Sequence, residues 1–183
     1  MGRGIHRGEE GALTTRKTPK LLATCKPGKE EQAEIEILDC LLPYDHEIDV
    51  ERTEFPGVLL VYSSLQPFEA YRRLKRCPKA YIQAITPIQV YIRTSVDEIL
   101  KSAIKLVEGV LKPEDTFAVR CRKRGKLIRS SVEVERVVGK AIMESTGAKV
   151  DLENPQYVVV IEVVGQNTGI NLSSARNPNP PIT

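Results

Sequence analysis

The chain has few of the residues and motifs that enzymes use for catalysis. Among its 183 residues there are two histidines, His6 and His46, which leaves little material for general acid–base chemistry. The glycine-rich phosphate loop G-x-x-x-x-G-K-[ST] and the nucleophile elbow G-x-S-x-G are both missing, and no G-x-G-x-x-G follows a strand pattern. No H-x-E precedes a C-x-x-C, which excludes zinc deaminase chemistry. We therefore expect no catalytic residues and no cofactor.

Paired cysteine motifs and long hydrophobic runs are also missing. The four cysteines (Cys25, Cys40, Cys77 and Cys121) are far apart, and none belongs to a C-x-x-C pair. This spacing does not favour a metal site, so we expect each cysteine to act as a small apolar residue. The longest apolar run, residues 157–161, is much shorter than the roughly 20 residues that cross a bilayer. The N-terminus lacks an apolar signal-peptide region, and we expect a protein of the reducing cytoplasm.

Charge is segregated along the chain, although the net charge is only +3. Residues 30–54 hold ten acidic residues against one basic residue, Arg52, and so carry a net −9. Since the total is +3, the remaining residues carry +12. Such asymmetry suggests a nucleic-acid partner for the basic part.

The first half of the chain shows the pattern of one small domain. Residues 1–20 are rich in glycine and arginine and are expected to be a disordered basic tail. Strand and helix patterns then follow in the order β-α-β-β-α-β, which is the split βαβ or ferredoxin-like pattern. We therefore predict an α+β fold with an N-terminal ferredoxin-like (split βαβ) domain at residues 21–94.

A second unit is expected at residues 95–174, followed by an extended tail at residues 175–183. Ser95 stands three residues before Glu98, and Ser130 three before Glu133, which is the spacing of a capping box at a helix start. Apolar residues at helical spacing follow both serines, and they predict helices at residues 95–108 and 131–145. The almost continuously apolar residues 157–164 predict a central strand.

The stretch FAVRCRKRGKLIRSS, residues 117–131, is the strongest functional signal. Phe117, Val119 and Cys121 alternate with other residues at the period of a strand, and Gly125 breaks the run before the capping box. Six basic residues and no acidic residue lie in the stretch: Arg120, Arg122, Lys123, Arg124, Lys126 and Arg129. A cationic loop that ends at a helix N-terminus is suited to bind a polyanion. We expect reversal of Arg122, Lys123 and Arg124 to glutamate to abolish RNA binding and leave the fold intact.

A second basic cluster is a possible secondary RNA contact. It comprises Arg72, Arg73, Lys75, Arg76 and Lys79, against Glu69 alone. A plain solvated helix face explains this cluster equally well.

The second unit resembles a THUMP domain over residues 95–173. The segments FAVRCRKRG (residues 117–125), SSVEVERVVGKAI (residues 130–142) and GAKVDLENPQYVVVIEV (residues 147–163) carry this resemblance and occur in that order. The preceding unit is similar to the ferredoxin-like domain that accompanies THUMP in tRNA-modifying proteins. The predicted architecture is thus a ferredoxin-like domain followed by a THUMP-like α/β domain.

This resemblance implies a non-catalytic adaptor that binds tRNA and positions it for a separate modification enzyme. The best-known stand-alone THUMP proteins assist an acetyltransferase that converts a tRNA cytidine to N4-acetylcytidine. The resemblance implies that Arg120, Arg122, Lys123, Arg124 and Lys126 face RNA phosphates. It also implies that Ser130 and Ser131 offer hydroxyl and backbone N–H groups, and Arg129 completes the candidate site.

Two other readings of the sequence are open. One is a tRNA-modifying enzyme with an unrecognised active site. The other is a protein-interaction module that docks a basic partner through its acidic face, residues 30–54.

Overall fold

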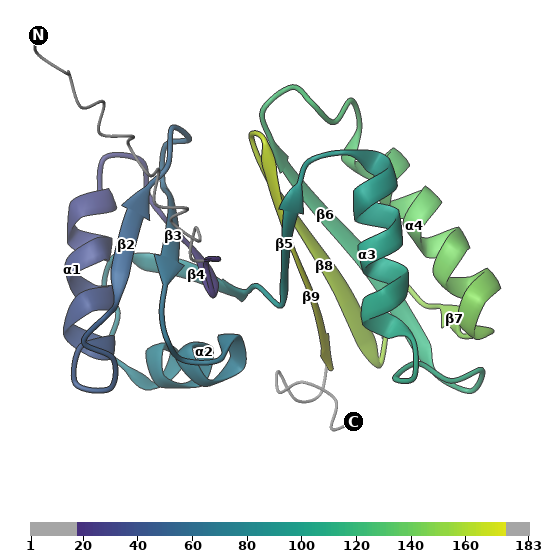
Figure 1. Ribbon diagram of the computed structural model, residues 1–183, viewed down its shortest axis with the longest axis horizontal. Coiled ribbons are helices and arrows are strands. Elements are labelled where there is room, and N and C mark those ends of the chain that lie inside the picture. Colours follow the sequence, from purple (N-terminus) through teal and green to yellow (C-terminus); the bar gives the residue numbers. More distant parts are fainter. Residues whose placement is uncertain (1–17, 175–183) are drawn as a thin grey trace, which may run out of the picture.

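The computed structural model describes residues 18–174, which fold into two sheets with helices on one face of each (Figure 1). Most of the tail predicted at residues 1–20, and all of that predicted at 175–183, lies outside this range. Lys20 does lie within it. Its N–H donates to the carbonyl of Val61, and its carbonyl accepts from Ile88, so the first sheet takes in the last residue of the predicted tail.

The N-terminal unit (residues 18–87) is a four-stranded antiparallel sheet with the strand order β2-β3-β1-β4. Two helices pack on one face of the sheet, over a core that includes Leu21, Ile37 and Leu74. The elements are β1 (Leu21–Cys25), α1 (Glu30–Leu41), β2 (Asp49–Arg52), β3 (Val58–Tyr62), α2 (Pro67–Arg76) and β4 (Ile82–Pro87).

The C-terminal unit (residues 90–174) is a five-stranded mixed sheet with the order β5-β9-β8-β6-β7, in which β6 runs parallel to both of its neighbours. Its elements are β5 (Val90–Arg93), α3 (Val96–Val107), β6 (Thr116–Arg124), α4 (Ser131–Thr146), β7 (Lys149–Val150), β8 (Tyr157–Val164) and β9 (Asn167–Ser174). Both helices cover the face of the sheet that carries Val119, Ile161 and Ile170. Within residues 18–174, no helix is long and apolar enough to cross a membrane.

The predicted helix starts at Ser95 and Ser130 are confirmed. The Ser95 hydroxyl accepts a hydrogen bond from the Glu98 N–H at 3.1 Å, and the Ser130 hydroxyl accepts from the Glu133 N–H at 3.3 Å. Each bond satisfies one of the backbone donors that a helix start leaves without a partner. At the other end of α4, Gly147 adopts φ +75°, a left-handed conformation that favours glycine.

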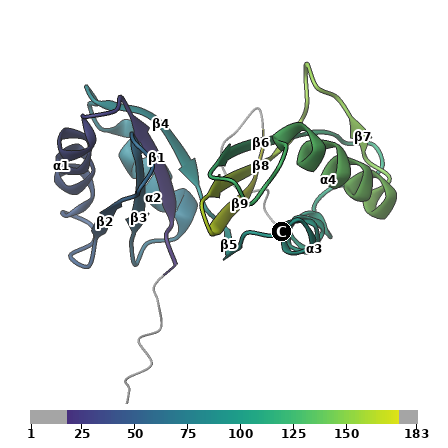
Figure 2. The same ribbon diagram turned by 90° about the horizontal axis from the view of Figure 1, so that it is seen from above.

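The two units lie side by side and are joined where β4 leads into β5 (Figures 1 and 2). β5 pairs with β9, so the division between the sheets falls at residues 88–89, before the domain boundary predicted at residues 94 and 95. The Gln89 N–H donates to the Ile170 carbonyl, and the Asn171 amide donates to the Pro87 carbonyl, both at 3.0 Å. Ile88 is buried between the units. The linking residues are therefore held by both sheets.

The prediction that every cysteine is a small apolar residue is wrong for two of the four. Cys40, in α1, and Cys77, just after α2, form a disulfide with their Cα atoms 6.2 Å apart. They are 37 residues apart in sequence, and only the packing of both helices on one sheet face brings them together. Cys25 and Cys121 are buried free thiols, as expected.

A buried carboxylate, Asp45, ties two loops of the N-terminal unit together. Its side chain is 4% exposed and accepts hydrogen bonds from the Ser63 hydroxyl, from the Ser64 hydroxyl and N–H, and from the Glu47 N–H. Burial alone would raise the pKa of this carboxyl group. The hydrogen bonds from Ser63, Ser64 and Glu47 outweigh burial and lower the pKa from 3.8 to about 2.

We expect Asp45→Asn to show a pH-dependent loss of stability. Because the folded-state pKa is depressed, the charged carboxylate stabilises the fold above pH ~4, and this contribution is lost as the pH falls toward about 2. A shift of this size corresponds to about 2 kcal/mol. Urea unfolding of both proteins from pH 6 to pH 2 should show a gap of this size that closes on acidification. A gap that stays constant over this range would contradict the assignment.

Candidate nucleic-acid interface

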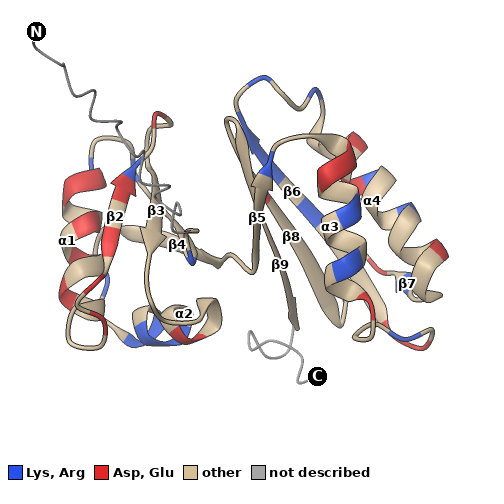
Figure 3. Cartoon of the chain, in the orientation of Figure 1, with Lys and Arg blue, Asp and Glu red and all other residues tan. Residues whose placement is uncertain are grey.

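Strand β6 divides its side chains between two faces of the sheet. Phe117, Val119 and Cys121 are buried beneath the helices, as the alternating pattern predicted. Arg120, Arg122 and Arg124 therefore lie on the opposite face, about 7 Å apart along the strand. The blue part of β6 in Figure 3 marks the basic residues of this strand, the three arginines and Lys123.

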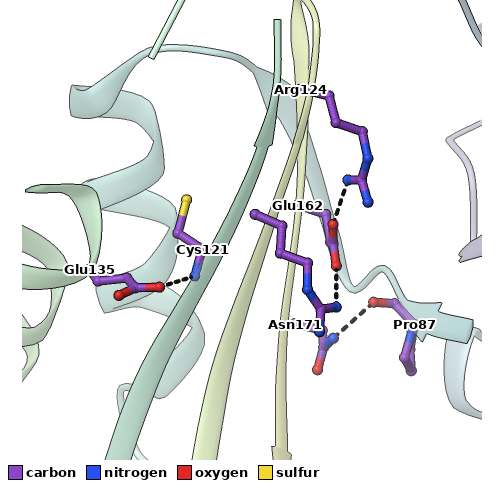
Figure 4. Close-up of polar contacts among 7 residues, drawn as sticks. Pro87, Cys121, Arg124, Glu135, Glu162 and Asn171 are labelled. Carbon is purple, nitrogen blue, oxygen red and sulfur yellow. Dashed lines mark hydrogen bonds and ion pairs between the residues drawn. The ribbon is translucent and has the colours of Figure 1, made fainter. Parts of the chain in front are cut away.

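A buried acid, Glu162, lies beneath this row. It is on β8, directly opposite Arg122 in the strand register, and its side chain is 1% exposed. One carboxylate oxygen accepts from Arg122 Nη1 at 3.1 Å and the other from Arg124 Nη1 at 2.7 Å. Figure 4 shows the carboxylate pointing toward Arg124. Residues 117–131 contain no acid, but the neighbouring strand provides the missing negative charge.

The three arginines consequently differ in their freedom to contact a ligand. The Arg124 side chain is 20% exposed and is held by its ion pair with Glu162. The Arg122 side chain also pairs with Glu162 but is 67% exposed, so part of it can contact a ligand. Arg120 donates from Nη2 to the Leu152 carbonyl at 2.6 Å and so holds the chain that follows β7. Reversing Arg124 to glutamate would place two carboxylates together in a buried site, and for this reason we expect a variant that includes this change to lose stability.

The free cations lie at the end of β6, which holds Lys123, and in the loop between β6 and α4, which holds Lys126 and Arg129. Lys123, Lys126 and Arg129 are exposed, and within residues 18–174 no carboxylate forms an ion pair with any of them. Ile128 is buried and anchors the loop between Lys126 and Arg129. Figure 3 shows these blue segments at one end of the C-terminal unit.

The start of helix α4 lies at the end of this loop. Ser130 is the capping residue and Ser131 the first helical residue, and both are partly exposed. The first turn of a helix carries unpaired N–H groups and partial positive charge, which attract an anion. The structure thus places Lys126, Arg129 and the two serines on one continuous segment.

The same end of the C-terminal unit meets the N-terminal unit. Gly125 and Gly165 both have positive φ, and a Cβ on either one would lie within 3.5 Å of the Phe55 ring. A cavity of about 440 Å³ opens beside them, with Arg93 and Lys126 in its wall. Arg93 donates to the Gln166 side chain at 3.3 Å. Phe55 therefore holds the basic loop against the N-terminal unit.

Sequence reasoning missed both Glu162 and Arg93 as members of this region. A usable signal for Glu162 was present, because it is the one charged residue in the apolar run YVVVIEVV. A lone acid in a central strand requires a buried partner. Arg93 gave no such signal, because its proximity to Lys126 depends on the order of strands in the sheet.

The predicted secondary cluster on α2 is separate from this interface. Figure 3 shows the basic residues of α2 at the opposite end of the molecule from the loop after β6. Arg73 pairs with Glu69 at 2.7 Å and lies over the Tyr44 ring, 3.9 Å from its centre. Lys79 donates to three backbone carbonyls at the end of α2. Lys75 and Arg76 are exposed, as is Arg72, which borders a cavity between the units.

The acidic segment, residues 30–54, lies on α1, on β2 and in the adjoining loops of the N-terminal unit (Figure 3). Several of its carboxylates have structural partners. Glu30 accepts from the Gly57 N–H at 2.6 Å, and Glu36 accepts from three successive N–H groups, those of Ala80, Tyr81 and Ile82. These bonds fix the turn before β3 and the start of β4.

Known proteins resemble this chain in sequence and in fold. A probable tRNA sulfurtransferase of Methanocaldococcus jannaschii is 33% identical over 132 residues, which cover 68% of this chain and 34% of that protein. PH1313 from Pyrococcus horikoshii has a crystal structure that matches 85% of this chain and 54% of its own, with a TM-score of 0.68 at 22% identity. A 4-thiouridine synthetase–RNA complex with bound ATP matches 85% of this chain and 41% of its own, with a TM-score of 0.59 at 18% identity. The two structures show a shared fold.

The chain spans about a quarter to a third of the length of curated relatives that it matches. The model of one protein family, the THUMP domain, matches residues 93–172. This range takes in α3, β6, α4, β7 and β8, and most of β9, and it includes the basic loop and Glu162. Residues 93–172 of this chain are a THUMP domain.

Proposed function

We propose that this protein binds tRNA through the end of β6, the loop that follows it and the start of α4. The observation that carries the proposal is the set of free cations Lys123, Lys126 and Arg129 around a helix N-terminus, inside a THUMP domain. Phosphates would be bound by these cations, by the exposed part of Arg122 and by the first N–H groups of α4.

The relatives favour tRNA over other polyanions. The curated relative from Methanocaldococcus jannaschii is named a probable tRNA sulfurtransferase, and a protein of the same fold was solved in complex with RNA. Those names describe those proteins, and we extend the substrate class to this chain. Contacts to phosphate fix the position of a nucleic acid without reading its sequence, so selection of tRNA would depend on its shape.

We also propose that the N-terminal unit is a ferredoxin-like domain that takes part in binding. The order of its elements is β-α-β-β-α-β, with the strand order β4-β1-β3-β2 and both helices on one sheet face, which fits that architecture. The cavity lined by Phe55, Arg93 and Lys126 lies where both units meet. An RNA strand that follows the basic loop would therefore touch both units.

We propose further that the protein acts in the cytoplasm as a non-catalytic adaptor for a separate modification enzyme. Burial raises the pKa of the Cys121 thiol, on β6, to about 12, with Glu135 adding to the effect. This thiol stays protonated at neutral pH. The enzyme served would be a cytidine acetyltransferase, as the resemblance implies. The names of the curated relatives favour thiolation as a second candidate reaction.

The pure chain is expected to bind tRNA and to leave it chemically unchanged. Binding to total tRNA is measured by fluorescence anisotropy, with duplex DNA of equal charge as the control, and tRNA nucleosides are then analysed by mass spectrometry. Incubation is repeated with acetyl-coenzyme A, and with ATP and a sulfur donor. Equal affinity for tRNA and DNA would contradict tRNA selection, and a new nucleoside made by the chain alone would contradict the adaptor role.

A further inference from the structure

An apolar groove runs between helix α4 and the outer edge of β6, and we call it the α4 groove. It has a volume of about 370 Å³. Four of its apolar side chains are strongly exposed: Val132 by 58%, Met143 by 44%, Val150 by 46% and Leu152 by 60%. Exposed apolar side chains gathered in one groove are typical of a binding surface.

The groove is open because α4 has a glycine where a side chain would fill it. Gly139 is buried in the lining, and a Cβ placed there would have only one neighbour within 4 Å, Val119 Cγ2 at 3.8 Å. Val132, Gly139 and Met143 are seven and four residues apart, so they share one side of the helix. This apolar side extends over about three turns, or about 16 Å.

The edge of β6 beside the groove is already occupied by side chains. The Cys121 N–H donates to the Glu135 carboxylate at 2.7 Å, which Figure 4 shows reaching across from α4. The Val119 carbonyl accepts from Arg120 at 3.5 Å. A protected edge is unsuited to pairing with an added strand. The occupant is expected to bind through side chains, as a helix in a groove does.

The charges around the groove indicate the character of the occupant. Arg136 and Lys140 border it on α4, whereas Glu135 is already engaged with β6. Lys140 forms an exposed ion pair with Glu144 at 3.8 Å. Exposed pairs of this kind contribute little energy, so the Lys140 side chain can turn toward a ligand in the groove. A rim with these two cations attracts carboxylates and would repel the same rim on a second copy of the chain. The lining offers no exposed aromatic ring on which an RNA base would stack.

We propose that the α4 groove binds a short amphipathic helix of a partner protein. The apolar side of that helix would lie on Val132, Met143 and Leu152, and its flanking carboxylates would face Arg136 and Lys140. The groove begins at Val132, next to the start of α4 that the proposed RNA site uses, and runs along α4 away from the basic loop. A protein and an RNA would therefore bind to adjoining surfaces that meet at the start of α4. We expect the modification enzyme of the proposed function to be the partner that carries this helix. The inference rests on the proposed function in this one respect and otherwise goes beyond it.

The test uses a fluorescent 15-residue helical peptide with leucines at helical spacing and glutamates beside them. The full chain is expected to bind this peptide with a Kd on the order of tens of micromolar. A matched peptide with lysine in place of each glutamate is expected to bind about 10-fold more weakly or worse. Failure to bind the glutamate peptide, or equal binding of both, would overturn the proposal.

Variants of the groove locate the binding site. Met143→Glu with Leu152→Glu should weaken peptide binding about 10-fold or more, because both changes put charge on the apolar lining. Leu152→Glu alone is a second variant, since this side chain is the more exposed of the two and tolerates the change. Ile35→Glu, on α1 and 51% exposed, is the matched control and should bind normally. Undiminished binding by both groove variants would overturn the assignment.

Two further measurements separate the alternatives. Sedimentation that shows a dimer disrupted by Leu152→Glu would assign the groove to a second copy and overturn the proposal. A loss of tRNA affinity in the same variant would assign the groove to RNA and also overturn it. Peptide binding by a chain that fails to bind tRNA would leave the groove assignment intact while the proposed function fails.

Discussion

Reversing Lys123, Lys126 and Arg129 to glutamate is expected to weaken tRNA binding by about 100-fold or more near physiological salt. Each of these side chains is exposed and free of a carboxylate partner within residues 18–174, so the change removes phosphate contacts without breaking an ion pair. The slope of log affinity against log salt should fall by about 3, close to one for each cation removed. Fluorescence anisotropy across a salt series measures both quantities.

The matched control reverses three other exposed lysines, Lys101, Lys105 and Lys112, which lie on or just after α3. It changes the net charge by the same amount, so a general electrostatic effect would appear equally in both variants. We expect the control to lose much less affinity and to keep most of the salt slope. A similar loss in both variants would mean that net charge, and not the loop after β6, determines binding.

Replacing Glu162 by alanine is expected to lower the free energy of unfolding by about 3 kcal/mol. The Arg124 side chain, 20% exposed, would lose its carboxylate partner and remain partly buried as an unpaired charge. Arg122, at 67% exposed, would be hydrated and adds little to the loss. Urea unfolding at neutral pH measures the change. A loss below about 1 kcal/mol would mean that the buried carboxylate is not what holds Arg124.

Two controls separate the buried charge from the loss of side-chain volume. Replacing Glu162 by leucine together with Arg124 by methionine removes both charges and keeps apolar volume, and should recover most of the stability. Glu153→Ala changes an exposed glutamate in the loop before β8 and should be neutral. If the double replacement were as unstable as Glu162→Ala, packing would explain the loss better than charge.

Local patterns in the sequence predict the elements of the C-terminal unit well. The serines at the starts of α3 and α4 form hydrogen bonds with N–H groups three residues ahead, and the N–H of the glycine after α4 donates to a carbonyl four residues back. A short window of sequence therefore contains both partners of each bond. The same holds for β6, where alternation separates the buried Val119 from the exposed Arg120. Interactions of this kind depend on helix and strand geometry alone.

The ion pairs and contacts of the candidate site depend on which segments become neighbours. Glu162 is about 40 residues from its arginine partners, and Cys40 is 37 residues from Cys77. Both pairings arise from the order of strands and the packing of helices, which no local window encodes. The sequence therefore predicts which basic residues the segment contains. It does not predict which of them form ion pairs, because that depends on the strand that lies beside them in the sheet.

The position of β5 has a consequence for how the THUMP domain is isolated. The family match begins at residue 93, yet β9 completes its hydrogen bonds with β5, at Val90–Arg93. A fragment that starts at residue 93 would keep only the last residue of β5 and leave most of β9 as an open sheet edge, and open edges invite pairing between molecules. Such a fragment would also lose Pro87, which caps the buried amide of Asn171. A fragment that keeps both the pairing of β5 with β9 and the hydrogen bond to Pro87 therefore has to begin well before the first residue of the family match.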